Sequence, residues 1–226
     1  RDKVESTMSE IKKIKSKKNI CLMADQQTKG VGRRSASWVS PKGNIYISIL
    51  LKNIINTHNH FYNTAHTANI ICDVIENICN VETKIKWPND ILIKNKKISG
   101  IISEIYNTNN DVFINTGLGI NITSSPIVNE YETTFINEYS RKINNIDFLY
   151  ELMDEYLKNI NVLKKKSILI IDKYKSRLKY LSQNIKLKLD DNYLKEGLFY
   201  GLNNDGSIIL KSKNNFENIY NARIVQ

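Results

Sequence analysis

Cysteine and proline are scarce in this sequence, with 3 residues of each among 226. Cys21, Cys72 and Cys79 are odd in number and form no CxxC pair, which argues against a disulfide framework and against a cysteine zinc site. No stretch approaches the roughly 18 consecutive apolar residues that a membrane-spanning helix needs. The N-terminus also lacks the apolar core of a signal peptide. These absences predict a cytoplasmic protein without membrane segments.

Recognisable metal ligands are also few. His58, His60 and His66 lie close together in the sequence, but no nearby cysteine or carboxylate completes a familiar ligand set. We therefore expect no metal centre at this cluster, and the sequence by itself leaves any metal ligands unknown.

The charge balance is strongly basic. The chain has 33 lysines and arginines against 23 acidic residues, a net charge of +10, which suits binding to a polyanion such as nucleic acid. Lysine, asparagine and isoleucine are abundant along the whole chain, however, so the excess is typical of a general compositional bias. A noncatalytic nucleic-acid-binding protein stays open as an alternative, although no recognisable binding motif supports it.

Glycine divides the chain into three zones: 30–119, a glycine-free stretch over 120–196, and 197–206. Glycine marks sharp bends and close approaches, so the zones predict a site-bearing region, a helical connector and a turn-rich end. The predicted fold is α+β, with helices packed on a multistranded sheet over residues 1–181 and a small β domain over 182–226. Periodicity predicts helices over 5–18, 61–79, 147–163 and 167–181, and strands over 19–25, 44–51, 83–88, 90–95, 97–106 and 111–122.

Two stretches have the composition of a functional site. "GVGRRSASW", residues 30–38, combines glycines that expose backbone N–H groups with arginines suited to phosphate or carboxylate, although a basic surface loop has the same composition. "KWPNDILIKNKKISG", residues 86–100, predicts a tight turn and a lysine-rich hairpin, and its lysines are equally typical of solubility and edge protection. "GLGINI", residues 117–122, is not a dinucleotide fingerprint, because Ile122 replaces the third glycine.

The order of these motifs resembles one family. "EST" before a helix, "QQTKGVGRRSASW", "SPKGNIYIS", "KWPNDILIKNKKISGIISE" and "GLGIN" follow one another over residues 5–123. Together they resemble the catalytic domain of biotin protein ligases, also called biotin–acetyl-CoA-carboxylase ligases. "FYGLNNDGSIIL" is more loosely similar to the SH3-like β-barrel that ends many members. The resemblance implies a biotin/lipoate ligase-like mixed sheet with packed helices, in a monofunctional form without an N-terminal DNA-binding domain.

The resemblance also implies a two-step activity. Biotin is activated with ATP and Mg²⁺ as biotinyl-5′-AMP, and the biotinyl group is then transferred to a lysine of a biotin carboxyl carrier protein. No DNA partner and no membrane partner are expected, and a homodimer is left open. The nearest rival is a lipoate or octanoate ligase or transferase of the same fold, against which the "KWPND" motif counts.

The family's site residues map onto this sequence by motif. Asp90 matches a carboxylate that orients or deprotonates the acceptor lysine, although turn stabilisation explains it too. Thr7 has a competing explanation, because Thr7 and Glu10 have the spacing of a capping box. A packed tryptophan is the alternative for Trp38, and a strand bulge is the alternative for Gly100. The predicted catalytic residues are Arg33, Lys97 and Asp90; the biotin-binding residues Ser6, Thr7, Met8, Gln27, Gly30, Val31, Gly32, Arg33, Lys97 and Gly100; and the nucleotide-binding residues Arg33, Trp38, Asn89, Lys97 and Asn121.

The loop departs from the family's usual G-R-G-R-x-G-R-x-W pattern. Val31 replaces an arginine, Ser35 a glycine and Ala36 a second arginine. The loop is therefore less basic and less flexible than its relatives' loops. We expect the chemistry to be retained, with altered closure over the adenylate or altered affinity for it.

Overall fold

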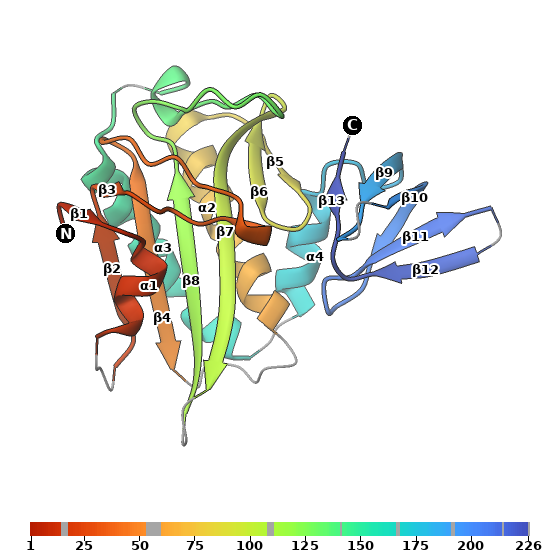
Figure 1. Ribbon diagram of the computed structural model, residues 1–226, viewed down its shortest axis with the longest axis horizontal. Helices are drawn as coiled ribbons and strands as arrows, with labels where there is room; N and C mark the ends of the chain where they lie inside the picture. The colour runs from red at the N-terminus through yellow and green to blue at the C-terminus, as the bar shows by residue number, and fades with distance from the viewer. Residues whose placement is uncertain are drawn as a thin grey trace.

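A six-stranded antiparallel sheet forms the centre of the computed structural model, which describes residues 1–14, 18–52, 60–107, 111–140, 142–165, 168–190, 193–213 and 215–225 (Figure 1). The order of its strands is β2-β4-β8-β7-β6-β5. All six strands that the sequence predicts in this region are present, with ends shifted by a few residues. Their bounds are β2 Ile20–Ala24, β4 Ile45–Lys52, β5 Thr83–Lys86, β6 Asp90–Ile93, β7 Lys96–Asn107 and β8 Val112–Ile120.

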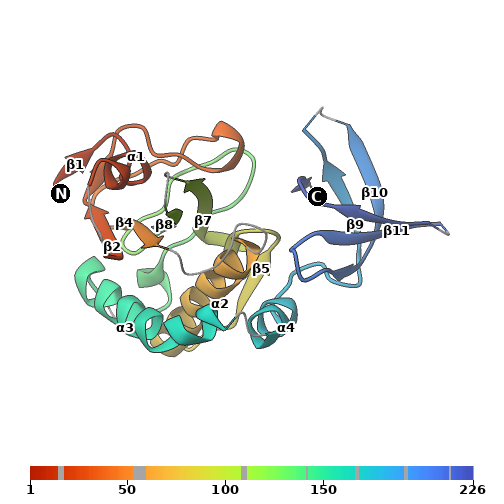
Figure 2. The same cartoon turned by 90° about the horizontal axis from the view of Figure 1, so that it is seen from below.

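Both faces of the central strands are covered. Helix α2 (His60–Cys79) packs on β5, β6 and β7, and α3 (Asn145–Lys164) and α4 (Ile168–Ser176) pack against α2. The short helix α1 (Thr7–Lys12) contacts β2, β4 and β8, and Figure 2 shows it on the opposite side of the sheet from α2 and α3. Burial on two faces explains why β4 is buried from Ile45 to Leu51 and is mostly apolar, instead of alternating between apolar and polar residues.

The four predicted helices are confirmed, but some of them end earlier than the sequence predicts. Helix α3 begins after Asn144, whose side chain accepts a hydrogen bond from the backbone N–H of Asp147, a normal N-cap arrangement. Helix α4 ends at Ser176, five residues before the predicted end. The guanidinium of Arg177 then bonds Asp73 and Glu76 of α2, which fixes the end of α4 against the core. The predicted helix 5–18 is likewise shorter, and residues 15–17 and 167 lie outside the described part of the chain.

The chain ends in a second, five-stranded sheet with the order β12-β11-β10-β9-β13. In the described residues no ladder joins β12 to β13, so the predicted barrel is seen here as an open sheet. The two sheets share buried contacts: the indole N–H of Trp87 donates to the carbonyl of Gly206 at 2.8 Å. We propose the domain boundary between residues 181 and 182. The strands are β9 Asn184–Lys188, β10 Leu194–Leu202, β11 Ile208–Ser212, β12 Asn215–Ile219 and β13 Arg223–Ile224.

The described residues also form four smaller elements. Strand β1 (Lys3–Val4) pairs in parallel with β3 (Gln26–Gln27), and short 3-10 turns lie at η1 (Arg33–Ser35) and η3 (Ile136–Glu138). Among the helices that the structure describes, none is long and apolar enough to cross a membrane.

Candidate active site

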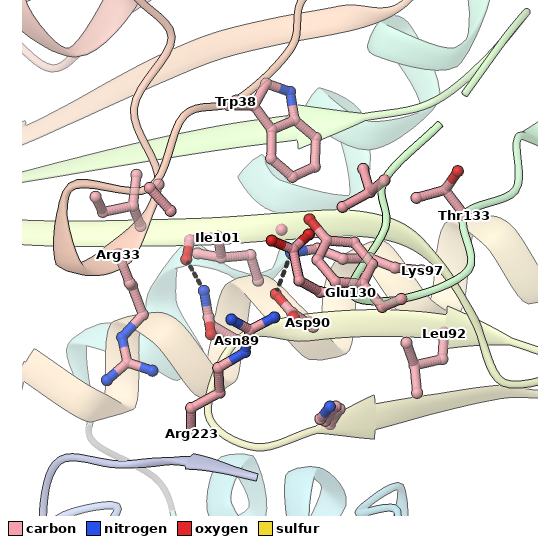
Figure 3. Close-up of a pocket in the computed structure, with 18 of the residues that line it drawn as sticks. Arg33, Trp38, Asn89, Asp90, Leu92, Lys97, Ile101, Glu130, Thr133 and Arg223 are labelled. Atoms are coloured by element: carbon pink, nitrogen blue, oxygen red, sulfur yellow. Dashed lines mark hydrogen bonds and ion pairs between the residues drawn. The ribbon is translucent and has the colours of Figure 1, made fainter. Parts of the chain in front are cut away.

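A cavity of about 990 Å³ opens between the two sheets, at the large end of the range usual for small-molecule sites. Its floor is formed by β6, β7 and β8, and the loop that carries η1 covers one side (Figure 3). The segment 126–133 and residues 222–224 of the C-terminal sheet close the other sides. The lining comprises 31–34, 36–39, 86–90, 100–102, 117–119, 126–133 and 222–224, with Thr7, Met8, Gln27, Leu92, Lys94, Asn95, Lys97, Asn121, Lys179 and Tyr180.

One end of the cavity is uncharged and organised around Gln27. The Gln27 side-chain carbonyl accepts hydrogen bonds from the Thr7 backbone N–H at 2.8 Å and from the Thr7 hydroxyl at 3.1 Å. Its amide nitrogen donates to Ser40 at 3.2 Å. The hydroxyl of Ser48 donates to that of Thr7 at 2.9 Å, so this network is anchored in the sheet. Neutral donors and acceptors of this kind suit an uncharged polar ligand group such as a urea.

The predicted capping box is wrong. The N-cap of α1 is Ser6, whose side chain makes no capping hydrogen bond, and Thr7 is the first helical residue. The Thr7 hydroxyl is used by Gln27 and Ser48 instead, because the helix begins beside β3 and β4 rather than in solvent. Ser6 is buried, and its hydroxyl has no partner within the described residues. Ser6 and Gly30 do not line the cavity, whereas Thr7, Met8 and Gln27 do.

The loop at residues 31–37 is closed on itself. Val31 and Ser37 form an isolated antiparallel bridge. The Gly32 N–H donates to the Ala36 carbonyl at 2.7 Å, and the Trp38 N–H donates to the Gly30 carbonyl at 2.9 Å. The loop therefore holds its shape through its own backbone hydrogen bonds.

Arg33 points away from the centre of the cavity floor (Figure 3), and its Nη2 donates to Asn221 Oδ1 at 2.8 Å. Burial, followed by the adjacent charge of Arg34, lowers the pKa of Arg33. The guanidinium still carries its charge near neutral pH, so Arg33 is a cation at the rim of the cavity, and its predicted contact with an anion stays a prediction.

Lys97 lies at the centre of the floor, with its ammonium 2.7 Å from Asp90. The same ammonium lies 5.2 Å from the Trp38 ring centroid and 5.1 Å from that of Tyr131. The side chains of Lys97 and Asp90 are 14% and 25% exposed. Water therefore screens the pair only partly, and the charge is available to a ligand in the cavity.

A β-bulge aims Lys97 into the cavity. Ile91 pairs with Ser99, whereas the next residue, Leu92, pairs with Lys97, so β7 has one extra residue at position 98. Residues three apart on a regular strand face opposite sides, but the bulge turns Lys97 and Gly100 to the same side. A Cβ on Gly100 would lie 3.4 Å from the Lys97 nitrogen. A strand bulge and a place in the site are therefore compatible explanations of Gly100, because the bulge is what brings Gly100 and Lys97 to the same side.

Trp38 occupies a slot made by two glycines. Gly100 and Gly119 are directly paired across β7 and β8, and a Cβ on either residue would touch the indole, at 3.0 Å for Gly100 and 2.3 Å for Gly119. The Trp38 indole N–H has no partner among the described residues, and neither has the buried side-chain oxygen of Asn121. Both residues line the cavity. Unpartnered buried groups of this kind are ready to bond a ligand.

Asn89 has a structural use in addition to its predicted one. Its side-chain amide donates to the Ile101 backbone carbonyl at 2.6 Å, and the backbone carbonyl of Asn89 accepts from the Ile101 N–H at 3.0 Å. The turn before β6 is thereby fastened to β7. Asn89 lines the cavity, so its predicted contact with the nucleotide stays a prediction.

Three cations of the cavity wall were missed by sequence reasoning: Lys86, Lys179 and Arg223. Burial lowers the pKa of Lys86, and Arg223, Lys179 and Lys97 add to this effect against the opposing charge of Asp90. No carboxylate of the described residues forms an ion pair with Lys86, Lys179 or Arg223. The "KWPND" motif could have drawn attention to Lys86, but the other two have no local signal.

The described residues contain no group of three side chains able to hold a metal ion by themselves. The cavity carboxylates are Asp90, Glu130 and Glu132. Asp90 is paired with Lys97, and Glu132 lies 3.6 Å from Lys96.

Comparisons with known proteins agree with this fold. The sequence model of the Biotin/lipoate A/B protein ligase family matches residues 2–121, and the chain belongs to that family. It is similar over 97% of its length to the bifunctional ligase/repressor BirA of Bacillus subtilis, at 26% identity and covering 70% of that protein. It is 27% identical to the biotin–[acetyl-CoA-carboxylase] ligase of Mycobacterium tuberculosis over 47% of the chain and 41% of that protein. The biotin protein ligase of Aquifex aeolicus in complex with biotin and ATP has a similar fold, with a TM-score of 0.82 at 24% identity, over 99% of this chain and 95% of that one.

Proposed function

We propose that this protein is an ATP-dependent biotin–protein ligase that forms biotinyl-5′-AMP and transfers the biotinyl group to a lysine of a carrier protein. The observation that carries the proposal is one cavity that joins an uncharged hydrogen-bonding end at Gln27 to a cationic end at Lys97. Biotin has a neutral ureido ring at one end and a carboxylate at the other. The names of the relatives, and the biotin and ATP bound to the Aquifex aeolicus enzyme, support the same conclusion.

The first step brings two anions together. A carboxylate oxygen of biotin attacks the α-phosphorus of ATP, the bond between the α-phosphorus and the bridging oxygen breaks, and pyrophosphate leaves with the electron pair. Lys97 is suited to hold the carboxylate and the α-phosphate, because its ammonium lies at the centre of the cavity floor. Lys86, Lys179 and Arg223 supply positive charge for the remaining phosphates. Cations fixed in a partly dehydrated cavity lower the repulsion between the reactants.

The second step transfers the biotinyl group. The amine of the carrier lysine attacks the carbonyl carbon of the mixed anhydride, the bond from that carbon to the phosphate oxygen breaks, and AMP leaves. Asp90 is suited to accept the proton that the amine loses, because it lies beside Lys97 at the floor. The pairing with Lys97 also keeps Asp90 neutralised while the anionic substrates bind.

Mg²⁺ fits the cavity only as a companion of the nucleotide. Mg²⁺ is usually held by one or two carboxylates together with substrate phosphates and water. Glu130 is the carboxylate of the described lining that no ion pair occupies, so it is the residue that would hold the ion. When bound, Mg²⁺ supplies charge neutralisation at the phosphates.

The carrier is proposed from chemistry and from names. A relative is a ligase for acetyl-CoA carboxylase, so we propose a biotin carboxyl carrier domain as the acceptor. The need for ATP supports the cytoplasmic location predicted from the sequence.

ATP–pyrophosphate exchange tests the proposal. We expect exchange that depends on biotin, followed by transfer to a carrier domain. If exchange occurred with lipoate and not with biotin, the protein would be a lipoate ligase instead of a biotin ligase. No exchange with either acid, together with salt-dependent binding to random duplex DNA, would favour the nucleic-acid-binding alternative.

Lys97→Gln is the matching variant. We expect it to lower the exchange rate about 100-fold or more, the usual effect of losing one group that stabilises developing charge. Lys96→Gln is the control, because Lys96 is the neighbouring lysine of the same hairpin and does not line the cavity. Equal rates for the two variants would contradict the role given to Lys97.

A further inference from the structure

Two arginines of the loop reach across to the C-terminal sheet. Arg33 Nη2 donates to Asn221 Oδ1 at 2.8 Å, and Arg34 Nη2 lies 2.8 Å from Asp190 Oδ1. Asn221 in turn donates to Asp190 Oδ2 at 2.6 Å, and Arg34 Nη1 donates to the Lys188 carbonyl at 3.3 Å. We call Arg33, Arg34, Asp190 and Asn221 the clasp. It connects residues separated by more than 150 positions in the chain.

The clasp acts on a loop that keeps its own shape. The Val31–Ser37 bridge and the bond from Gly32 to Ala36 close the loop internally. In the described part of the chain, every side-chain hydrogen bond and ion pair of Arg33 and Arg34 goes to the C-terminal sheet. The position of the loop over the cavity therefore depends on the C-terminal sheet as well as on its two ends.

The chemistry of the clasp leaves Arg33 free to bind a phosphate as well. A guanidinium has five N–H donors in a planar fork, and Asn221 uses one nitrogen of Arg33. Asp190 neutralises Arg34, which reduces the repulsion between two adjacent cations. The wall next to the clasp is already part of the site, because Ala222, Arg223 and Ile224 line the cavity directly after Asn221.

We propose that Asn221 and Asp190 are positioning residues, which hold the arginine loop over the cavity so that Arg33 meets the activated intermediate. This inference rests on the proposed function. In this chain Val31, Ser35 and Ala36 stand where the family's loop usually has an arginine, a glycine and a second arginine. The contact with the C-terminal sheet therefore compensates in part for the weaker hold of this loop on the adenylate. The opposite arrangement, in which the clasp withholds Arg33 from the intermediate, predicts effects of the opposite sign.

The first test measures how fast biotinyl-5′-AMP leaves the enzyme. We expect Asn221→Ala and Asp190→Ala to speed dissociation about three- to tenfold, the range expected for losing one or two partly exposed polar contacts. The KM for biotin should rise, while kcat for exchange changes less than about twofold. Asp190→Glu keeps the charge and should restore slow dissociation. Glu217→Gln is the control, because it removes a carboxylate from the Lys195 ion pair within the same sheet, away from the loop.

Slower dissociation in the Ala variants would overturn the proposal in favour of a clasp that withholds Arg33. Unchanged dissociation in variants whose thermal unfolding matches that of Glu217→Gln would overturn it as well.

A second test needs no activity. We expect hydrogen exchange of the Gly32, Ala36 and Trp38 amides in the ligand-free protein to quicken in Asn221→Ala and Asp190→Ala but not in Glu217→Gln. Equal exchange in all variants would show that the clasp does not hold the loop. If the wild-type protein failed ATP–pyrophosphate exchange, the proposed function would fall, and amide exchange would still report on the clasp.

Discussion

The Trp38 slot predicts a large effect from a single methyl group. An ideal Cβ on residue 119 would lie 2.3 Å from Trp38 Cε2 and 2.5 Å from Cζ2 and Nε1. Ordinary contacts between carbon atoms are about 3.5–4.0 Å, so the indole or strand β8 must move by more than about 1 Å. The indole is rigid and the strand is hydrogen-bonded on both sides. We expect Gly119→Ala to lower the free energy of unfolding by about 1–3 kcal/mol, the usual cost of overpacking.

The same substitution should also weaken nucleotide binding. Displacing the indole removes its contact with the Lys97 ammonium, now 5.2 Å from the ring centroid, and moves the unpartnered indole N–H. We expect the KM for ATP in exchange to rise about tenfold, in keeping with the loss of roughly one charge-assisted contact. The KM for biotin should change less, because Gln27 is untouched.

A double-mutant cycle separates the slot from a general defect in β8. In a Trp38→Ala background, Gly119→Ala should cost less than about 0.5 kcal/mol, because the atoms it would meet are gone. Gly201→Ala is the matched control in the other sheet, since its Cβ would meet nothing closer than 3.5 Å. Equal costs for Gly119→Ala in the two backgrounds, measured by chemical denaturation, would refute this reasoning.

Three further predictions follow from the site and the core. Burial and neighbouring cations lower the pKa of Lys86, so the folded state binds this proton less tightly than the unfolded chain, and the charge of Lys86 costs stability at neutral pH. Lys86→Met should therefore raise the free energy of unfolding by about 0.5–1 kcal/mol and raise the KM for ATP. Lys84→Met, which lies outside the cavity on the same strand, should leave that KM unchanged. Burial lowers the pKa of His66 to about 4, so as the pH falls the imidazole is protonated in the unfolded chain before it is protonated in the folded protein. The neutral buried His66 contributes up to about 3 kcal/mol of stability above pH 6.5, and this contribution should be lost between about pH 6.5 and 4. In urea unfolding, His66→Gln should lack this part of the acid sensitivity. Gln27→Ala leaves the Thr7 N–H without its acceptor, and the KM for biotin should rise about tenfold with that for ATP unchanged; a KM for ATP that rises equally would contradict a separate biotin end.

Local patterns predicted the elements well because their causes are local. The strands from 83 to 122 follow from apolar residues between polar turns. The hairpin at Lys94 and Asn95 is confirmed, and both residues have positive φ, as a two-residue turn between twisted strands requires. The loop at 30–38 was likewise found from its composition.

The missing parts of the site depend on contacts between distant segments. Lys179 follows α4 and Arg223 begins the last strand, so nothing near either residue in the sequence indicates a wall shared with Lys86. The use of the Thr7 hydroxyl depends on β3 and β4 lying beside the helix start. A capping box is a local prediction, and tertiary partners replaced it here.

The bulge at position 98 makes the pairing of β6 and β7 more important than residue type in this hairpin. If β6 and β7 paired evenly with Ile98 kept in the ladder, Lys97 and Gly100 would lie three residues apart on a regular strand, and Lys97 would face the helix layer instead of the cavity. A lysine cannot stay charged in that apolar layer at low cost. Ile98 itself is fully buried, yet a conservative exchange such as Ile98→Val should be tolerated. A change that abolishes the bulge while every residue of the hairpin stays is therefore expected to turn Lys97 out of the cavity, whereas many substitutions between Lys97 and Gly100 are not.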